Sequence, residues 1–386
     1  MQTKREIIYL AGFLFSLPIA LTAYINSSFL QIYAGPYYVG ALYILSSIIT
    51  IWSLSGLPQI LTKYGNRRTA LIFSVLIFVA FLLLALSGNI FLAVPAFILF
   101  FAASNLLYIS LDIFIEDFSG HIPHRSTIGR FRGWYLMILN SAWVIAQLIS
   151  GSVIARSSYR GIYLLSAGFM ILVSAIFLLA LRDFKDPGYK KMPVGRTIKY
   201  FLRNKHISKI YILNFILKFF FAWMIIYTPI YLHEYIGFGW SQIGLIFTIM
   251  LLPFVILEFP LGMWSDKIGE KEMLLAGFSI SALFTLVIPF IPEPRLWLWA
   301  GVLFATRVGA ATIEVMSENY FFKLVREENA DAISFFRNTG PLSYIIAPLL
   351  AIPILLFVPS FEYLFYILGA ILLVGLLITL RIKDVQ

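Results

Sequence analysis

A short polar stretch occurs twice in this chain, each time between two long apolar runs, and this repetition constrains the fold more than any other feature. The first copy lies at residues 62–67 and the second at residues 262–271. A further match, between residues 128–132 and 333–337, has an offset of 205 positions. A repeat on this scale predicts two structurally equivalent halves. The matched residues of the two polar stretches, each pair 204 positions apart, are Lys63 with Lys267, Gly65 with Gly269, and Arg67 with Lys271.

The composition predicts that both halves lie in lipid. Of 386 residues, 60% are hydrophobic and only 12% are charged, and the mean hydropathy is +0.89. A chain this apolar has too little polar surface to stay dispersed in water. The absence of cysteine excludes disulfides and thiolate metal sites. The first apolar run begins at Ile7 without a boundary typical of cleavage, which indicates a retained helix.

The lengths of the apolar runs predict helices rather than barrel strands, because a membrane-spanning helix needs about 20 residues and a barrel strand only about 10. We expect an all-α membrane protein with twelve transmembrane helices. Six belong to an N-terminal bundle at residues 1–181 and six to a C-terminal bundle at 208–386, joined by a linker at 182–207 with a short basic helix near 197–204. The predicted spans are 7–30, 37–55, 69–87, 90–112, 132–155, 160–181, 208–233, 240–261, 272–291, 296–317, 335–357 and 361–381.

The distribution of positive charge predicts the orientation of the chain. When loops are assigned alternately to the two membrane faces, 24 of the 29 Lys and Arg fall on the face of the N-terminus and three on the other, with Lys218 and Arg307 inside helices. This asymmetry predicts that both termini and the linker are cytoplasmic, as in a multi-pass protein of a prokaryotic inner membrane. The net charge of +10 is then explained by contact with lipid headgroups, and we expect no nucleic-acid partner.

Twelve predicted helices, a basic linker in mid-chain and the pattern Gly-x-x-x-Asp-Lys-x-Gly-x-Lys between the eighth and ninth helices together resemble the major facilitator superfamily (MFS) over essentially the whole chain. The resemblance implies two pseudo-symmetric six-helix bundles that transport a solute by alternating access. It also implies a cytoplasmic gate at the loop. The first copy departs from the pattern, with Thr62 at the Asp position and Pro58 opposite the first Gly, so we expect the stronger gate in the second half. The gate residues implied there are Gly262, Asp266, Lys267, Gly269 and Lys271.

Charged residues at other helix ends extend this gate hypothesis. Glu314 and Glu318 are four residues apart, so both project from one helix face, and Arg337 begins the next helix. Such acid–arginine pairs lock one conformation and separate in the other. The alternative is that these charges only mark solvated helix ends. The equivalent residues in the first half are Asp112 and Glu116 at one helix end and Arg130 and Arg132 at the start of the next.

Two cations in mid-helix predict a binding site. A charge at the bilayer centre is unfavourable by about 2.5–3.5 kcal/mol on insertion scales, so Lys218 and Arg307 need a cavity or a partner. We interpret both as ligands for an anionic group, with Asn214 one turn from Lys218. The alternatives are that Lys218 snorkels to the membrane surface and that Arg307 forms a structural pair with Glu314.

Neutral polar and aromatic side chains complete the predicted site, although the same residue types also serve helix packing. Candidate proton carriers are Glu258, Glu314 and Asp112. The neutral candidates for substrate binding are Asn26, Asn105, Tyr108, Asn140, Trp143, Trp223 and Tyr344.

No pattern in the sequence indicates catalysis. The chain has no Walker loop, and its four His show no metal-ligand spacing on a helix, so we expect no enzyme, no cofactor and no metal site. We predict a monomeric secondary active transporter for a small polar or anionic solute, with proton coupling as an option. One alternative is a proton-coupled multidrug or metabolite efflux antiporter, although residues 146–151 lack the proline typical of that group. A second alternative is a membrane-embedded lipid-handling enzyme or flippase.

Overall fold

The structure is a computed structural model that describes residues 2–120, 125–181, 204–324, 335–358 and 360–382. Every regular element in these ranges is a helix. The chain forms two compact units. The first contains Met1–Lys191 together with Gly239–Gly244, and the second contains Met192–Phe238 and Leu245–Gln386.

The first unit consists of six helical elements, which do not correspond one to one to the predicted apolar runs. The run predicted at 7–30 forms two helices with a short turn between them. The runs predicted at 132–155 and 160–181 follow one another in α6, where Ser158 leaves the helical conformation with φ 56° and ψ −170°. The elements are α1 (Gln2–Ala23), α2 (Asn26–Ala34), α3 (Pro36–Tyr64), α4 (Asn66–Leu86), α5 (Ile90–Gly120) and α6 (Arg125–Leu179).

The second unit repeats this order with different breaks. Its first apolar run ends in a π-helix that begins two residues after Pro229, and its second run is divided at Leu257. The elements are α8 (Lys205–Ile230), η1 (Tyr231–Tyr235), α9 (Trp240–Ile256, whose residues up to Gly244 are grouped with the first unit), α10 (Glu258–Ile268), α11 (Glu270–Val287), η2 (Ile288–Phe290), α12 (Leu296–Leu324), α14 (Thr339–Phe357) and α15 (Tyr363–Leu380).

The helices are long and apolar enough for a multi-pass membrane protein. Among the described residues, nine helices meet the length and composition of a membrane span, or ten if one bent pair counts as a span. One of the nine, Met137–Leu179, contains 43 residues and includes the break at Ser158, so it holds two helices. Another element, α9, has only 17 residues but is followed at once by α10. The predicted all-α fold is confirmed, and a total of twelve spans is consistent with these helices.

The two polar stretches are not the open loops that the sequence indicates. Helix α3 continues through Tyr64 and α10 through Ile268, so only one non-helical residue separates each from the next helix. That residue is Gly65 in the first copy, with φ 76° and ψ 160°, and Gly269 in the second, with φ 95° and ψ 150°. Glycine is required at both positions because side chains disfavour positive φ. The prediction of a loop from Gly262 onward is therefore corrected, and Gly262 lies inside α10.

Side chains stabilise the break between α1 and α2 in the first unit. The side-chain amide Nε2 of Gln147 donates to the carbonyl of Ala20 at 2.6 Å, and the hydroxyl of Tyr163 donates to Oδ1 of Asn26 at 2.9 Å. Both contacts come from α6, which packs against α1 and α4. Backbone groups released by a helix break must find partners in a low-dielectric interior. These two bonds therefore fix α6 against the broken helix.

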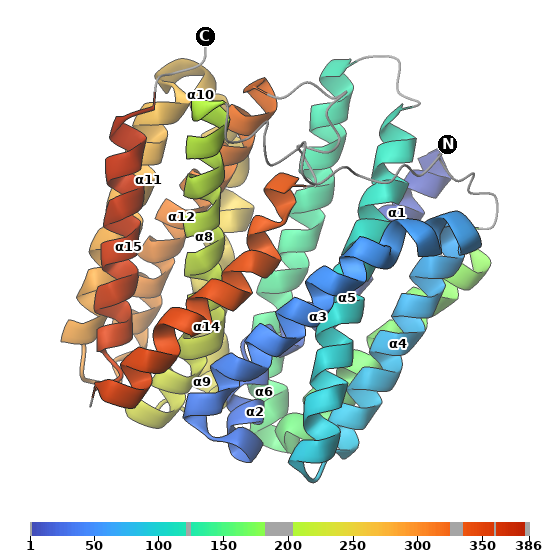
Figure 1. The fold of residues 1–386 in the computed structure, drawn as a ribbon, viewed down its shortest axis with the longest axis horizontal. Helices are drawn as coiled ribbons and strands as arrows, with labels where there is room; N and C mark the ends of the chain where they lie inside the picture. The colour runs from blue at the N-terminus through green and yellow to red at the C-terminus, as the bar shows by residue number, and fades with distance from the viewer. Residues whose placement is uncertain (1, 121–124, 182–203, 325–334, 359, 383–386) are drawn as a thin grey trace. The chain divides into compact units, whose positions relative to one another are not determined.

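The second unit is organised around α8 and α11. Helix α11 packs against α12 and α15, as Figure 1 shows, and α8 packs against α12, α14 and α15. Asn204 caps α8, because its side-chain oxygen accepts from the N–H groups of His206 and Ile207 at 3.1 and 3.3 Å. The short helix predicted near 197–204 otherwise lies outside the described residues.

Candidate solute-binding site

The predicted cation Lys218 forms an ion pair in the second unit. Its Nζ lies 2.6 Å from Oε1 of Glu314, which joins α8 to α12. The two side chains are 27% and 25% exposed. The contact also lies next to an aromatic ring, since Nζ of Lys218 is 5.2 Å from the ring centroid of Phe221. The sequence predicts a gate pair of Glu314 with Arg337, whereas the structure pairs the Glu314 carboxylate with Lys218.

Arg307, the second predicted cation, has a different environment. Its guanidinium carbon lies 4.7 Å from the ring centroid of Phe220 and 5.7 Å from that of Phe221. The residue is only 1% exposed. Cation–π contact offsets part of the cost of removing a guanidinium from water. Phe221 therefore contacts both predicted cations, and its ring in turn packs edge-on against Phe254 of α9 at 5.8 Å.

Other predicted residues of the second unit have structural contacts. Asn214, one turn before Lys218, donates from Nδ2 to Oγ1 of Thr339 at 2.8 Å and so ties α8 to the start of α14. Trp223 is fully buried and packs between the rings of Phe219 and Tyr227, with centroids at 5.2 and 5.6 Å. Tyr344 is half-buried on α14.

The Lys218–Glu314 pair belongs to a larger charged group. Glu318 of α12 and Arg337, which lies just before α14, are both within electrostatic range of the Lys218 ammonium. Glu318 is half-buried and Arg337 is exposed. Together with Arg307, this group contains three cations and two carboxylates. We name Lys218, Glu314, Glu318, Arg307 and Arg337 the charged cluster.

The predicted amides of the first unit are used within the fold. Asn26 accepts the hydrogen bond from Tyr163 and is 3% exposed. Asn105 donates from Nδ2 to the carbonyl of Phe101, one turn earlier on its own helix, at 2.8 Å. Asn140 is half-buried on α6.

Two predicted aromatic residues of the first unit lie together. The ring of Tyr108 packs edge-on against Phe15 at 4.7 Å, and its hydroxyl lies near Trp143 and within electrostatic range of Asp112. Trp143 packs against a buried apolar cluster from α1 and α6. The first unit thus brings Tyr108, Trp143 and Asp112 into one neighbourhood.

The predicted gate residues of the first unit interact with backbone and ring groups. Arg67 donates from Nε to the carbonyl of Phe177 at 2.8 Å and from a terminal nitrogen to that of Leu178 at 2.6 Å, at the end of α6. Lys63 is exposed, and its ammonium lies 5.1 Å from the ring centroid of Tyr64. A basic group at this position complements the carboxyl end of a helix.

In the second unit, the turn at Gly269 is accompanied by an ion pair that the sequence analysis missed. Oε1 of Glu270 lies 2.5 Å from Nζ of Lys323, and the two side chains are 2% and 43% exposed. The offset of 204 positions could have identified Glu270, because it matches Glu270 to Asn66, the residue after the first turn. There, Nδ2 of Asn66 donates to the carbonyl of Ser110 at 2.9 Å. Phe220, Phe221 and Thr339 were also missed, since apolar rings and threonines are abundant in such helices.

The remaining predicted residues are placed only in part. Glu258 begins α10 and is half-buried, and Lys271 is the half-buried second residue of α11. The side chains of several predicted gate residues lie outside the described part of the structure, namely Glu116, Arg130, Arg132, Asp266 and Lys267.

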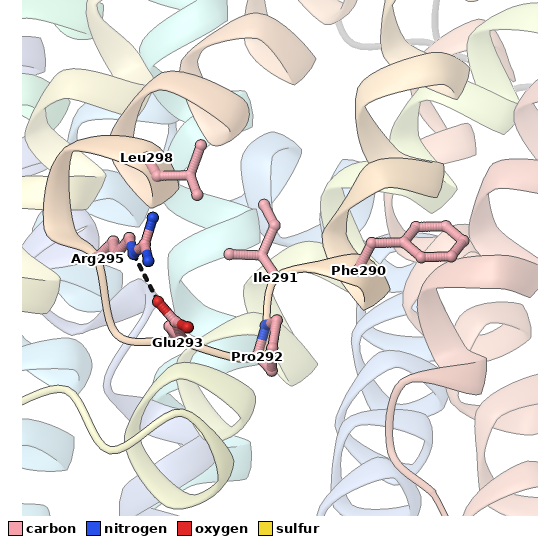
Figure 2. A pocket seen from close by; sticks show the side chains of 6 residues that line it. All are labelled: Phe290, Ile291, Pro292, Glu293, Arg295 and Leu298. Atoms are coloured by element: carbon pink, nitrogen blue, oxygen red, sulfur yellow. Dashed lines mark ion pairs between the residues drawn. The ribbon is translucent and has the colours of Figure 1, made fainter.

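A pocket of about 210 Å³ lies at the connection from α11 to α12 (Figure 2). Glu293 and Arg295 form an exposed ion pair there at 2.6 Å. None of the six lining residues is a predicted ligand. Among the residues that the structure describes, no group of three or more His, Cys, Asp or Glu is placed to hold a metal ion.

Residues 210–385 match the family model described as Major Facilitator Superfamily. No curated protein matches the chain. A solved structure described as a bacterial homologue of the iron transporter ferroportin, in an inward-facing state, has the same fold. Its TM-score is 0.75 at 14% sequence identity, over 99% of this chain and 98% of the other.

The second half of the chain thus matches the family model, and the chain as a whole has the fold of the solved transporter homologue. The match to the Major Facilitator Superfamily model is confined to residues 210–385, whereas the likeness in fold extends over both halves. The resemblance in the sequence is thereby confirmed.

Proposed function

We propose that this protein is a secondary transporter for a small anionic solute, and that Lys218 binds the anion. The observation that supports the proposal is the Lys218–Glu314 pair, a membrane-embedded cation that is about a quarter exposed. Ionisable groups at this depth are expensive to keep and are retained where they face a polar pathway. In this proposal the bundles at 1–181 and 208–386 alternate access to the site, and the linker and both termini are cytoplasmic.

The balance of charge favours an anion over a cation. The charged cluster carries three cations against two carboxylates, so its positive excess attracts a negative solute and repels a positive one. Arg307 contributes a buried positive charge next to Phe220 and Phe221, and Lys218 contributes the ammonium on the more exposed side chain. The solute's own gradient or a proton gradient would drive transport, with Glu258, Glu314 and Asp112 as candidate proton carriers.

The test is uptake by purified protein in proteoliposomes with an imposed pH gradient. The panel contains lactate, succinate and inorganic phosphate as anions, an amine, a sugar, and ferrous ion because the structural neighbour is described as an iron transporter homologue. We expect uptake of at least one anion and a loss of about tenfold to a hundredfold in Lys218→Gln, since a charge-assisted bond is worth about 1.5–3 kcal/mol.

Lys205→Gln is the matched control, because Lys205 is an exposed lysine at the start of the same helix. It should leave anion uptake unchanged. Uptake of only the amine or ferrous ion, or anion uptake that is equal in Lys218→Gln and wild type, would refute the anion site. Chemical conversion of a substrate without translocation would refute transport itself.

A further inference from the structure

The Lys218–Glu314 pair has a feature that a purely structural ion pair does not need. Both side chains are about equally exposed, at 27% and 25%, so neither partner is fully enclosed by the protein. The contact is a single one, from Nζ to Oε1 at 2.6 Å, and not a bidentate clamp. A solute with a carboxylate group like that of Glu314 can therefore approach the Lys218 ammonium.

We propose that Glu314 is a tethered competitor that occupies Lys218 until a small carboxylate displaces it. This inference rests on the proposed function and adds to it a substrate class and the residue that sets affinity. The substrate's carboxylate takes the position of the Glu314 carboxylate on the ammonium. No covalent bond changes, and the charge on Lys218 stays paired throughout.

A second ion pair in the same unit provides the contrast. Glu270 is sealed, at 2% exposed, and lies at the first turn of α11, where the helix dipole stabilises a carboxylate independently of Lys323. Glu314 lies within α12, far from the N-terminus of its own helix, and its ion pair is with Lys218. The Glu270 pair therefore joins two helices permanently, whereas the Glu314 pair can exchange.

The neighbours of the pair suit an exchange of this kind. Arg307 is held by Phe220 and Phe221 and is 1% exposed, so it stays in place while Lys218 changes partner. Arg337 lies within electrostatic range of Lys218 and is exposed. It offers the displaced Glu314 carboxylate a second cation, which reduces the cost of an unpaired charge in the membrane.

The experiment measures the half-saturating concentration for uptake of lactate, succinate and inorganic phosphate, each used alone as the probe. Removal of the competitor in Glu314→Gln should lower the half-saturating concentration of the two carboxylates by about tenfold, and that of phosphate by less. Glu314→Asp, with a shorter reach, should have an intermediate effect. Glu270→Gln is the matched control and should change none of the three values.

Two variants separate the possible failures. Lys218→Gln/Glu314→Gln removes both charges without leaving either one unpaired, so it should fold as wild type yet lose carboxylate uptake. Lys218-dependent carboxylate uptake whose affinity is unchanged or weaker in Glu314→Gln and Glu314→Asp would overturn the competitor role and leave the proposed function intact. Anion uptake that does not depend on Lys218 in any variant would overturn the proposed function.

Discussion

The turn between α3 and α4 and the turn between α10 and α11 have similar backbone conformations but are held by different side-chain interactions. Gly65 and Gly269 have φ values of 76° and 95°, and each separates two helices without any further loop residue. The next residue is buried in both copies. In the first it is Asn66, which donates to the carbonyl of Ser110, and in the second it is Glu270, which pairs with Lys323.

The two copies therefore share the conformation of the turn and differ in the interaction that holds it. A neutral amide–carbonyl bond depends little on salt, whereas an ion pair with a 43% exposed lysine is screened by it. The sequence predicts a stronger gate in the second half on the basis of Asp266. The charged contact that the structure describes there uses Glu270 instead, and a gating role for Asp266 is still a prediction.

The largest effect in this comparison is expected from the glycines. Gly65→Ala and Gly269→Ala should each lower the free energy of unfolding by about 1–3 kcal/mol, because a non-glycine residue is strained at these angles. Thermal unfolding in detergent measures both. If the two turns are equivalent, the two losses will be similar.

Gly262→Ala is the control for this prediction. Gly262 is helical, and an added Cβ meets no atom within 4 Å. Alanine should therefore stabilise the helix by about 0.5–1 kcal/mol. A loss at Gly262 as large as that at Gly269 would mean that the polar stretch opens as a loop, contrary to the structure.

A smaller effect is expected from the basic residue that follows the first turn. Arg67→Ala should cost about 1–2 kcal/mol, because it removes two bonds to the carbonyls of Phe177 and Leu178 at the end of α6. Arg67→Lys should recover part of this loss. In the second unit, Lys209 makes one exposed bond, at 2.5 Å, to the carbonyl of Arg381 near the end of α15.

Lys209→Ala should therefore cost less than Arg67→Ala in the same thermal unfolding measurement. Equal losses would show that the single Lys209 bond stabilises the end of α15 as much as the two Arg67 bonds stabilise the end of α6. A larger loss at Lys209 would reverse the ranking of the two halves.

The fold was largely predictable because it depends on run length and on the repeat. The apolar runs gave the approximate positions of the helices, and the offset of 204 positions identified the equivalent glycines. The breaks were less visible. Pro229 precedes the π-helix at Tyr231–Tyr235, but similar prolines lie inside α3 and α5 without ending them. The positive φ of Ser158 has no sequence signal.

The candidate site was predictable in its residues and not in their pairing. Lys218, Arg307 and Glu314 stood out because charges are rare in apolar helices. Which of them meet depends on how each helix is rotated about its axis. When lipid and protein are both apolar, hydrophobic periodicity does not fix that rotation. The sequence therefore left Glu314 between Arg337 and Arg307, whereas the structure places it on Lys218.

The smallest effect tests the difference between the two turns directly. Glu270→Gln should lower the free energy of unfolding by about 1 kcal/mol or less at low salt, because the partner Lys323 is 43% exposed and already partly screened. The loss should shrink further at high salt. Asn66→Ala should cost about 1 kcal/mol through its bond to Ser110, and this cost should not depend on salt.

The measurement is thermal unfolding of wild type and both variants at low and high ionic strength. Lys323→Gln should reproduce the salt dependence of Glu270→Gln, and the double variant should add nothing to either, since all three remove the same pair. If the effect of Glu270→Gln does not change with salt, the carboxylate acts through the amino end of α11 rather than through Lys323. The two turns would then differ in residue type alone, and the charge in the second copy would not link α11 to α12.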